Sequence, residues 1–484
     1  MSSNPAKLPL SELLELIIDH RGKTPNKMGF DDFFLSGVPV LSAKHVKTDG
    51  LVDVQSMRYA SAEMYKKWMK VEVQEGDIIL TSEAPMGEVF YIQDDKKYVL
   101  GQRVFGLRPN PRLINPKYLT AWLASSKGQR QIAARASGST VQGIRQSELL
   151  KLEVDLPSKE EQEIIANVRF SLTDKLSLNR SINQTLEAMA QAIFKSWFVD
   201  FDPVKAKIAA IEQGEDPQQA AMRAISGKTD AELDQMPREH HDQLAITAAL
   251  FPDAMEDAAQ GSANATSAER AGAASELGEI PKGWEVVPLS KMIRLIGGGT
   301  PKRSEPSYWG GTIPWFSVKD VPNDGDVWVV DTDEKITEAG LQKSSTKLLR
   351  KGTTIISARG TVGKLALVGQ EMAMNQSCYG VVGTDGVGDF FNYFNLKFAV
   401  EILKRNTHGA VFDTITQATF ETVTCVKPGN SVMKQFDEIV EPLLKGIRSN
   451  VFQSRELAEL RDTLLPKLLS GELSVDLVAE ENVQ

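Results

Sequence analysis

The segment Gly360-Thr-Val-Gly-Lys364 is the one that most resembles a catalytic motif, because glycines before a lysine can form a phosphate-binding loop. A complete loop of that kind has Gly, four further residues, Gly-Lys and then Ser or Thr. Here Ala358 stands at the first position and Leu365 at the last. The pattern instead predicts a strand, a turn at Gly363 and a return strand over 365–368.

Other residue types that could catalyse a reaction or bind a metal are sparse. The carboxylates of Asp200 and Asp202 follow an aromatic helix end, where they are more typical of a helix stop. The chain has 5 His, which are scattered, and 2 Cys, Cys378 and Cys425, too few for a Cys-x-x-Cys zinc site. We therefore predict no catalytic residue and no metal site. An enzyme that uses Asp200, Asp202 or Lys364 remains a competing hypothesis.

Polar and basic residues on glycine-flanked loops suit contacts with phosphates and base edges of DNA. The candidates in the first half of the chain are Lys23, Lys44, Ser82, Glu83, Gln102, Arg103, Ser139, Gln142 and Arg145. The candidates in the second half are Lys302, Arg303, Lys319, Arg359, Lys364, Asn375, Gln376, His408 and Thr416.

A long amphipathic helix is predicted over 160–201, because its apolar residues recur in steps of mostly three or four. They are Ile165, Val168, Leu172, Leu176, Ile182, Leu186, Met189, Ile193 and Trp197, with Asn179 as the single polar member. Adding 271 to these positions gives a second apolar stripe, from Phe436 to Leu468, in which Asn450 answers Asn179. At ~1.5 Å per residue each helix is roughly 60 Å long and needs a partner. We expect the two to pair as an antiparallel coiled coil in which asparagine fixes the register.

The segment before the first helix also occurs twice. Gly37-Val-Pro-Val-Leu-Ser-Ala-Lys44 is answered by Thr312-Ile-Pro-Trp-Phe-Ser-Val-Lys319, and Gly76-Asp-Ile-Ile-Leu-Thr81 by Gly352-Thr-Thr-Ile-Ile-Ser357. Short strand-like runs broken by Gly and Pro predict a mixed α/β globule in each copy, hence an α+β protein with pseudo-two-fold symmetry. The predicted parts are a first globule (1–157), its helix (158–202), a connector (203–280), a second globule (281–429), its helix (430–470) and an acidic tail (471–484).

The net charge of −9 is unevenly distributed. The connector holds 14 acidic and six basic residues and the tail four acidic residues, which leaves a net charge of +3 for the rest of the chain. A DNA-binding face is therefore compatible with the composition. In the connector we expect a helix over 230–250 and a flexible second half. No apolar run reaches the roughly 18 residues of a membrane span, so we expect a cytoplasmic protein without membrane contact.

The order of these motifs resembles that of the specificity subunits of type I restriction-modification systems. The resemblance is carried by Leu277-Gly-Glu-Ile-Pro-Lys-Gly-Trp-Glu-Val-Val-Pro-Leu289, by Leu156-Pro-Ser-Lys-Glu-Glu-Gln162, and by Leu186 to Pro203, which includes Phe194-Lys-Ser-Trp-Phe-Val-Asp-Phe201. Gly360-Thr-Val-Gly363 with Asn375-Gln376 adds to it. The first copy departs from the second by having Glu83-Ala84 where the second has Arg359-Gly360.

The resemblance implies that each globule is a target recognition domain that reads one half of a bipartite double-stranded DNA target, with the helices setting the spacer. It implies two modification subunits and further restriction subunits as partners. S-adenosylmethionine, ATP and magnesium are then expected on those partners and no cofactor on this chain. The aromatic helix end (Phe194, Trp197, Phe198 and Phe201) is a candidate docking surface for a modification subunit. A non-enzymatic scaffold whose paired globules bind proteins is the alternative.

Overall fold

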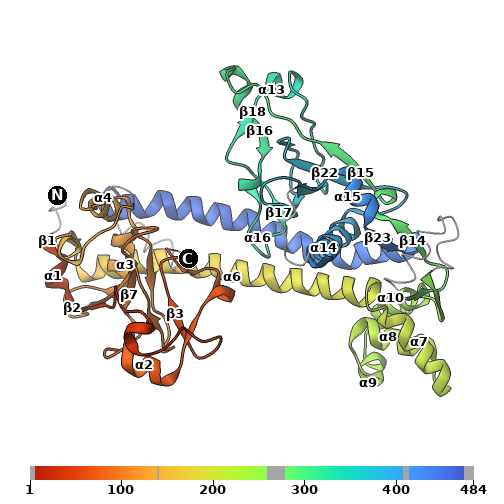
Figure 1. Ribbon diagram of the computed structural model, residues 1–484, viewed down its shortest axis with the longest axis horizontal. Helices are drawn as coiled ribbons and strands as arrows, with labels where there is room; N and C mark the ends of the chain where they lie inside the picture. Colours follow the sequence, from red (N-terminus) through yellow and green to blue (C-terminus); the bar gives the residue numbers. More distant parts are fainter. Residues whose placement is uncertain (1–5, 49, 139–140, 259–277, 407–413, 474–484) are drawn as a thin grey trace. The chain divides into compact units, whose positions relative to one another are not determined.

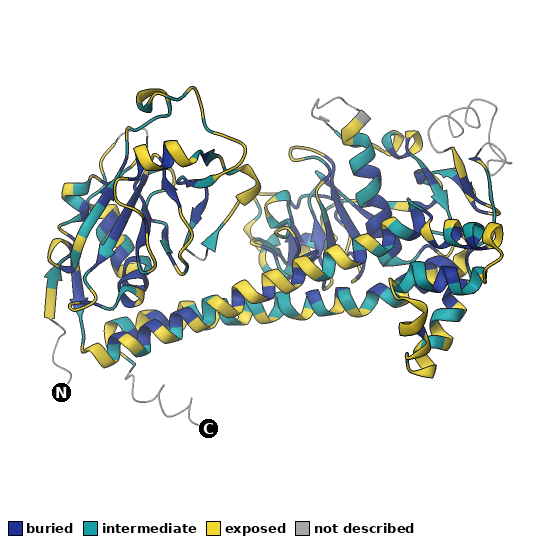
Figure 2. Ribbon diagram, turned by 90° about the horizontal axis from the view of Figure 1, so that it is seen from below, coloured by how far each residue is buried: buried dark blue, intermediate teal, exposed yellow. Residues whose placement is uncertain are grey.

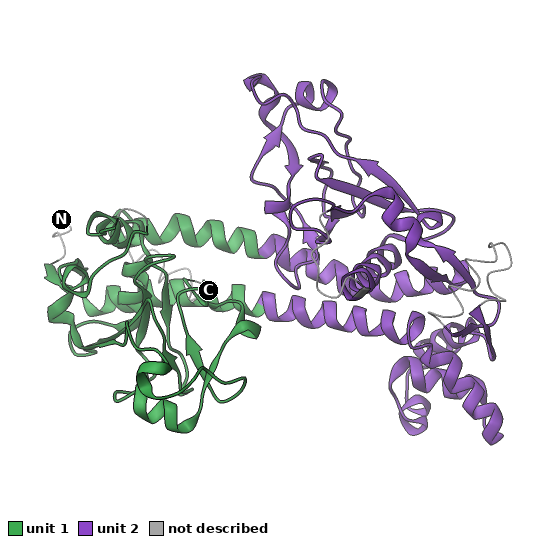
Figure 3. Ribbon diagram, in the orientation of Figure 1, with its two compact units in different colours: residues 1–178, 454–484 green, residues 179–453 purple. Residues whose placement is uncertain are grey.

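The computed structural model describes residues 6–48, 50–138, 141–258, 278–406 and 414–473. The chain divides into two compact units, one of residues 1–178 and 454–484 and one of residues 179–453 (Figure 3). Each unit contains one α/β globule, and the two long helices α6 (Lys159–Phe198) and α16 (Asn430–Ser470) each contribute residues to both units. We call the globule of residues 6–157 domain 1 and that of residues 281–429 domain 2.

Domain 1 is built on an antiparallel four-stranded sheet in the order β2 (Leu14–Asp19), β10 (Val104–Pro109), β7 (Ile78–Thr81) and β8 (Val89–Tyr91). A second sheet has the order β6 (Tyr59–Ala60), β3 (Val38–Leu41) and β9 (Val99–Leu100). β1 (Ala6–Pro9) pairs with β11 (Glu153–Leu156), and β4 (Val46–Lys47) with β5 (Gly50–Leu51). The helical elements are α1 (Leu10–Leu13), η1 (Asn26–Met28), η2 (Val54–Ser56), α2 (Ala62–Trp68), α3 (Pro116–Ala124), α4 (Ser126–Ala134) and α5 (Gln146–Leu149).

Helix α3 begins at a strong local start signal. The Asn115 side chain accepts hydrogen bonds from the backbone N–H groups of Lys117 and Tyr118, and Pro116 occupies the first turn. Its buried face reaches the closing strand, since the Tyr118 hydroxyl donates to the carbonyl oxygen of Asp155 at 2.9 Å and the Trp122 indole to the Asp155 carboxylate at 3.0 Å. These bonds fix the helix to the strand that leads into α6.

Domain 2 repeats this topology, which confirms the predicted repeat. Its main sheet has the order β15 (Ile293–Gly297), β22 (Cys378–Gly383), β19 (Thr354–Ser357), β20 (Leu365–Val368) and β17 (Trp328–Val329). A second sheet has the order β18 (Lys335–Ile336), β16 (Trp309–Phe316) and β21 (Ala373–Met374), and β14 (Glu285–Pro288) pairs with β23 (Thr424–Lys427). The helical elements are η3 (Leu289–Lys291), η4 (Pro306–Tyr308), η5 (Val318–Asp320), α13 (Glu338–Gln342), α14 (Asp389–Asn406) and α15 (Gln417–Thr422). Figure 1 shows α14 beside this domain's sheet.

The strand registers agree between the copies as well. Leu41 pairs with Leu100 in domain 1, and Phe316 with Met374 in domain 2, in parallel pairs. The predicted turn at Gly363 joins β19 to β20, with a positive φ of 78° that favours glycine. In Figure 2 the strands of both domains are mostly buried, and exposed residues gather in the loops and along the long helices.

The long helices pair antiparallel inside each unit. In the unit of residues 179–453, the Asn179 side-chain amide donates to Gln453 at 3.0 Å and that of Asn450 to Asn183 at 2.9 Å. Farther along, Leu186 lies against Gly446, and Phe198 packs on Phe436. In the other unit, Ile165 and Ala166 share a core with Leu465 and Leu468. Within the unit of residues 179–453, the residue numbers of facing positions add up to nearly the same value, as expected for an antiparallel pair.

The predicted apolar stripe of α6 is wrong at two positions, which are exposed and do not belong to the buried face. Ile182 and Met189 are 37% and 48% exposed, whereas Asn183 and Ala190 are buried in their place. Steps of three and four place Ile182 and Met189 on the apolar stripe. In the structure, the face of α6 that contacts α16 is shifted by one residue at both positions. The single asparagine expected in the seam is joined by a second buried amide, Asn183.

The connector contains more structure than the sequence predicts. Helices α7 (Asp202–Gln213), α8 (Pro217–Ser226), α9 (Asp230–Asp234) and α10 (Arg238–Ala249) precede a ribbon of β12 (Met255–Asp257) and β13 (Glu279–Pro281). The expected helix over 230–250 is divided at Pro237, and α7 and α8 were not anticipated. The expected flexible second half lies mostly outside the described residues.

Replacing Asn183 by leucine tests the amide pairing in the helix seam. The Asn183 amide accepts from Asn450 and donates to the Asp326 carboxylate at 3.0 Å, so leucine deprives both groups of a partner. We expect the free energy of unfolding of this unit to fall by about 1–3 kcal/mol, measured by urea denaturation followed through tryptophan fluorescence. Ser181→Ala, at an exposed position of the same helix, is the control and should leave the transition unchanged. An equally stable Asn183→Leu protein would contradict a role for the amides.

Candidate nucleic-acid interface

Three loops of domain 1 meet beyond the end of its main sheet. The Ser82 backbone N–H, after β7, donates to the carbonyl oxygen of Arg103, before β10, at 2.8 Å. The Ile144 N–H, before α5, donates to the carbonyl oxygen of Ser82 at 2.9 Å, and Glu83 forms a bridge with Gly143. We call residues 82–83, 101–103 and 142–145 the loop cluster of domain 1. Backbone hydrogen bonds hold it together, so its side chains are free to differ.

Domain 2 has the same cluster, formed by residues 358–359, 375–377 and 414–416. The Ala358 N–H donates to Ser377 at 2.8 Å, the Ile415 N–H to Ala358 at 2.9 Å, and Arg359 bridges Thr414. In both copies a further bond ties the cluster to the second sheet, from Gly101 to Leu41 and from Asn375 to Phe316. The two domains therefore present equivalent loops on one scaffold.

The exposed chemistry of the two clusters is different. In domain 1 the Arg103 guanidinium pairs with the Glu83 carboxylate at 3.1 Å, and both side chains are partly exposed. In domain 2 the corresponding positions are Arg359 and Ser377. The exposed part of the cluster is therefore a carboxylate paired with a guanidinium in domain 1 and an arginine in domain 2.

The structure distributes the predicted DNA-binding residues of domain 1 over three environments. Gln102, Arg103, Gln142 and Arg145 are exposed side chains of the loop cluster, and Glu83 is partly exposed. Lys23 and Lys44 line a cavity beside it together with Gln102. Ser82 is buried and contributes its backbone, so its side chain is not a contact residue. Ser139 lies outside the described residues.

In domain 2, Arg359 and Gln376 are exposed in the cluster, and Lys302 and Lys319 are exposed on neighbouring loops. Asn375 and Thr416 serve the fold: the Asn375 side chain accepts from the Ser377 N–H at 3.0 Å, and Thr416 caps α15. Lys364 lines a different cavity, beside Tyr393 and Glu187 of α6. His408 lies outside the described residues. The cluster expected from sequence thus contains only part of the predicted set.

Arg303 is bound within domain 2. Its guanidinium lies 3.9 Å from the ring centroid of Trp309 and 5.1 Å from that of Trp315, and it forms a two-point ion pair with Glu334. The hydrogen bonds to the Glu334 carboxylate are the main cause that raises the pKa of Arg303. A side chain held in this way presents a fixed charge.

Sequence reasoning missed the aromatic residues and the other basic residue around the domain 1 cavity. Phe33, Arg58 and Trp68 line it, with Ser42 and His45. Burial, and then the charge of Lys44, lowers the pKa of the His45 imidazole, whose Nδ1 lies 3.0 Å from the Ser42 hydroxyl. Alignment of residues 37–46 with 312–321 could have pointed to this region, because it places Val40 opposite Trp315.

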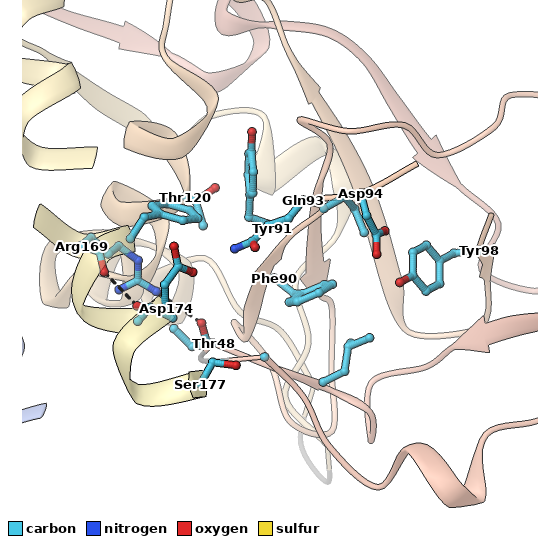
Figure 4. Close-up of a pocket in the computed structure, with 15 residues that line it drawn as sticks. Thr48, Phe90, Tyr91, Gln93, Asp94, Tyr98, Thr120, Arg169, Asp174 and Ser177 are labelled. Atoms are coloured by element: carbon cyan, nitrogen blue, oxygen red, sulfur yellow. Dashed lines mark hydrogen bonds between the residues drawn. The ribbon is translucent and has the colours of Figure 1, made fainter. Parts of the chain in front are cut away.

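A second hollow in domain 1, of about 280 Å³, lies where the domain meets α6 (Figure 4). Arg169 of α6 donates to the carbonyl oxygen of Thr48 at 3.3 Å, and Phe170 packs edge-on against Tyr91 at 5.1 Å. Domain 2 is attached to the helices in a similar way, since Trp328 donates to the carbonyl oxygen of Leu444 and Arg448 to that of Gly369. These contacts anchor each domain on its helices.

The aromatic end of α6 is a core and not an exposed docking surface, which corrects the sequence-based expectation. Phe194, Trp197, Phe198 and Phe201 are 4%, 1%, 6% and 7% exposed. Phe194 and Phe198 pack on Phe391 and Phe436 of domain 2 and α16, and Trp197 on Phe251 of the connector. The second domain and the connector together cover these rings.

The carboxylates considered for catalysis have structural roles. Asp200 pairs with Lys195 just after α6, and Asp202 begins α7, where a negative charge suits the helix dipole. Within the described ranges no group of three or more His, Cys, Asp or Glu could hold a metal ion. Burial raises the pKa of Cys378 and of Cys425 to about 12. In the same part of the chain, no helix combines the length and apolarity required to cross a membrane.

Residues 6–188 and 281–428 match the family described as the type I restriction modification DNA specificity domain. The chain is 31% identical to the specificity subunit of the type I restriction enzyme HindI of Haemophilus influenzae over 418 residues, 84% of this chain and 88% of that protein. It is 24% identical to the MjaIX specificity subunit of Methanocaldococcus jannaschii over 407 residues, 83% and 78% of the two chains. The fold is similar to that of the S subunit of a type I system from M. genitalium, with a TM-score of 0.52, 15% identity and 96% coverage of both chains.

Proposed function

This chain belongs to the specificity subunits of type I restriction-modification systems, and on that premise we propose that each of its two domains reads one half of a split, asymmetric DNA target. It is a recognition subunit and not an enzyme. The observation that carries the proposal is the pair of loop clusters, which share every backbone hydrogen bond described above and differ in their exposed side chains. A protein-binding scaffold is not favoured, because the family match covers both domains.

Within each cluster we assign base readout to the exposed charged residues. The Glu83–Arg103 pair of domain 1 offers an acceptor and a donor side by side, which fits the two edges of a C·G pair. Arg359 of domain 2 offers a donor alone, which fits guanine. Lys302 and Lys319 supply positive charge for phosphates, which position the protein without reading sequence.

Truncating these residues one domain at a time tests the assignment. Glu83→Ala should relax the target at one position of one half-site, and Arg359→Ala at one position of the other half-site. Each should lose about 1–3 kcal/mol of discrimination against the wrong base. Methylome sequencing of hosts that carry each variant with its modification partner gives the outcome. Glu63→Ala, which removes an exposed carboxylate of α2 outside the cluster, is the matched control for Glu83.

Two results would contradict the proposal in different ways. If Glu83→Ala altered both half-sites, the domains would not read separate halves. If a gel-shift assay with the wild-type chain and its purified modification partner showed no preference for any sequence, the chain would not be the recognition subunit of that pair.

The paired helices are proposed to set the number of base pairs between the half-sites. Domain 1 is anchored on α6 by Arg169, and domain 2 on α16 by Trp328 and Arg448. A change in the length of both helices would therefore change the distance between these attachment points. This role rests on the length of the helices, each roughly 60 Å.

Inserting seven residues into both helices at facing positions, after Lys175 and after Ala458, should lengthen the spacer. Seven residues add about 10.5 Å of helix, and one base pair occupies about 3.4 Å, so the spacer should grow by about three base pairs with both half-sites unchanged. Methylome sequencing provides the readout. The same insertion after Gly214, in the turn between α7 and α8, is the control. A changed half-site, or an unchanged spacer, would count against the helices as the measure of distance.

We further propose that two modification subunits bind the exposed apolar positions of the helices, and that restriction subunits join that assembly. Met189 of α6 and Leu460 of α16 are equivalent in the repeat, and they are 48% and 47% exposed. Two equivalent apolar positions suit two copies of one partner. The partners would hold S-adenosylmethionine, ATP and magnesium, and the complex would act in the cytoplasm.

Charged substitutions at these two positions test the docking proposal. Met189→Glu and Leu460→Glu should each weaken binding of the purified modification subunit by at least about tenfold, since a carboxylate would be buried in an apolar contact. Analytical ultracentrifugation measures the stoichiometry and affinity. Ser181→Glu, at an exposed polar position of α6, should leave both unchanged. Unaltered binding by the double variant would place the docking surface elsewhere.

A further inference from the structure

Domain 1 contains a cavity of about 270 Å³ next to its loop cluster. It lies between the loop after β2, the loop after β3, the end of α2 and the loop before β10, and Gln102 belongs both to its wall and to the cluster. The volume is just below the ~300–1,000 Å³ typical of small-molecule sites. A ligand in it would therefore be small and would sit beside the surface that is proposed to face DNA.

The chemistry of the wall is aromatic and basic. The partly exposed Phe33 ring packs on the buried Trp68, with ring centroids 5.8 Å apart, and the Arg58 guanidinium lies 5.9 Å from the Phe33 centroid. Lys23 and Lys44 supply two further cations, and no acidic residue is among the described residues of the wall. Such a set suits a flat aromatic ring that carries a negative charge.

The basic side chains are available to a ligand. Lys44 pairs with Asp53 at 3.6 Å and Arg58 with Asp32 at 3.3 Å, and all four side chains are more than half exposed. Exposed pairs of this kind contribute little to stability, so they can be exchanged for a new anion. Burial, followed by the charge of Lys70, lowers the pKa of the Lys23 ammonium, which donates to the carbonyl oxygen of Trp68 at 2.7 Å. Polar groups that fix orientation are present in Ser42 and Gln102.

Domain 2 has filled the corresponding place. Val40 of β3 and Trp315 of β16 are equivalent, since Val40 pairs with Val99 and Trp315 with Ala373 in the same register. The Trp315 indole donates to the carbonyl oxygen of Gly299 at 3.0 Å and packs edge-on on Trp309, and Arg303 lies over both rings. The chain thus shows what occupies this position when it is closed: an aromatic ring with a guanidinium stacked on it.

We propose that the domain 1 cavity binds one nucleotide, with the base against Phe33 and its phosphate held by Lys23, Lys44 or Arg58. The inference rests on the proposed function, because it places the cavity at the DNA-facing loops. The nucleotide can come from two sources. One is a base of the target that has left the duplex stack, and the other is a free nucleotide that binds as a small ligand.

A mismatch scan distinguishes these sources. The complex of the chain with its modification partner is titrated with duplexes that carry one mismatch at each position of the half-site read by domain 1. Where a base enters the cavity, the mismatch removes the cost of unpairing that base, and binding should tighten by about tenfold or more. Separately, 2-aminopurine deoxyriboside 5′-monophosphate is titrated into the complex without DNA, and its fluorescence is followed.

Val40→Trp closes the cavity with the residue that domain 2 uses. It should abolish the gain at the mismatch, or the binding of the free nucleotide, while the target sequence at the domain 2 half-site stays the same. Val71→Trp, an exposed position of domain 1 outside the cavity, is the matched control and should behave as wild type. Because Val40 is buried and tryptophan is larger, Phe33→Ala serves as a second variant that removes one aromatic face without adding volume.

A mismatch gain that Val40→Trp and Phe33→Ala both lose supports a base from DNA, and nucleotide binding that both lose supports a free ligand. A mismatch gain that persists in both variants, or no gain and no nucleotide binding in wild type, overturns the proposal. If the wild-type complex bound all DNA sequences equally, the proposed function itself would be refuted.

Discussion

The rest of the structure depends on a pair of buried amides in the seam between α6 and α16. Asn179 and Asn183 are each 1% exposed, in a helix face that otherwise buries apolar residues. A buried amide without a partner costs about 1–3 kcal/mol, and here Gln453 and Asn450 face them. Sliding one helix by a turn in either direction would leave at least one of the two asparagines opposite a residue without an amide, such as Gly446 or Leu457, so only one register pairs both of them. Asn183 also donates to Asp326, which ties the position of domain 2 to that register.

The contacts that hold the domains and their loops in place do not involve the exposed side chains of the loops. The domains are fixed to the helices by side chains of the helices that donate to backbone carbonyl groups, as Arg169 does to Thr48 and Arg448 to Gly369. The loop clusters are held by backbone hydrogen bonds such as Ser82 to Arg103 and Ala358 to Ser377. Neither set depends on which side chains the loops carry. Glu83 in one copy and Arg359 in the other are therefore compatible with the same fold.

The elements whose signals are local could be predicted from sequence. The turn at Gly363 and the two long helices depend on residues close together in the chain, and each is confirmed. The sequence analysis did not identify helices α7 and α8, because the acidic composition of the segment is typical of a connector. The start of α8 nevertheless has a helix-start signal, Asp216 before Pro217. The exposure of Ile182 and Met189 could not be read from periodicity, since which residue faces α16 depends on the angle of the pairing.

The candidate site was predictable only in part for a related reason. Residue type and flanking glycines identify polar loops, but they do not tell whether a side chain points to solvent or holds its own loop. Ser82 and Asn375 look like contact residues in the sequence, yet one is buried and the other accepts from Ser377. The burial of Phe194 and Trp197 required knowledge of domain 2 and the connector, which lie far along the chain.

The two domains also differ in how firmly they hold the basic side chains near their loops. Arg303 is fixed by two tryptophan rings and by Glu334, so it loses little conformational entropy when it meets an anion. In domain 1, Lys44, Arg58 and Arg103 each pair with a single, partly exposed carboxylate, an arrangement worth about 0–1 kcal/mol. Such pairs open at low cost when a phosphate or a base competes for the cation. At these positions domain 2 therefore holds its guanidinium in place, whereas the cations of domain 1 can exchange their partners.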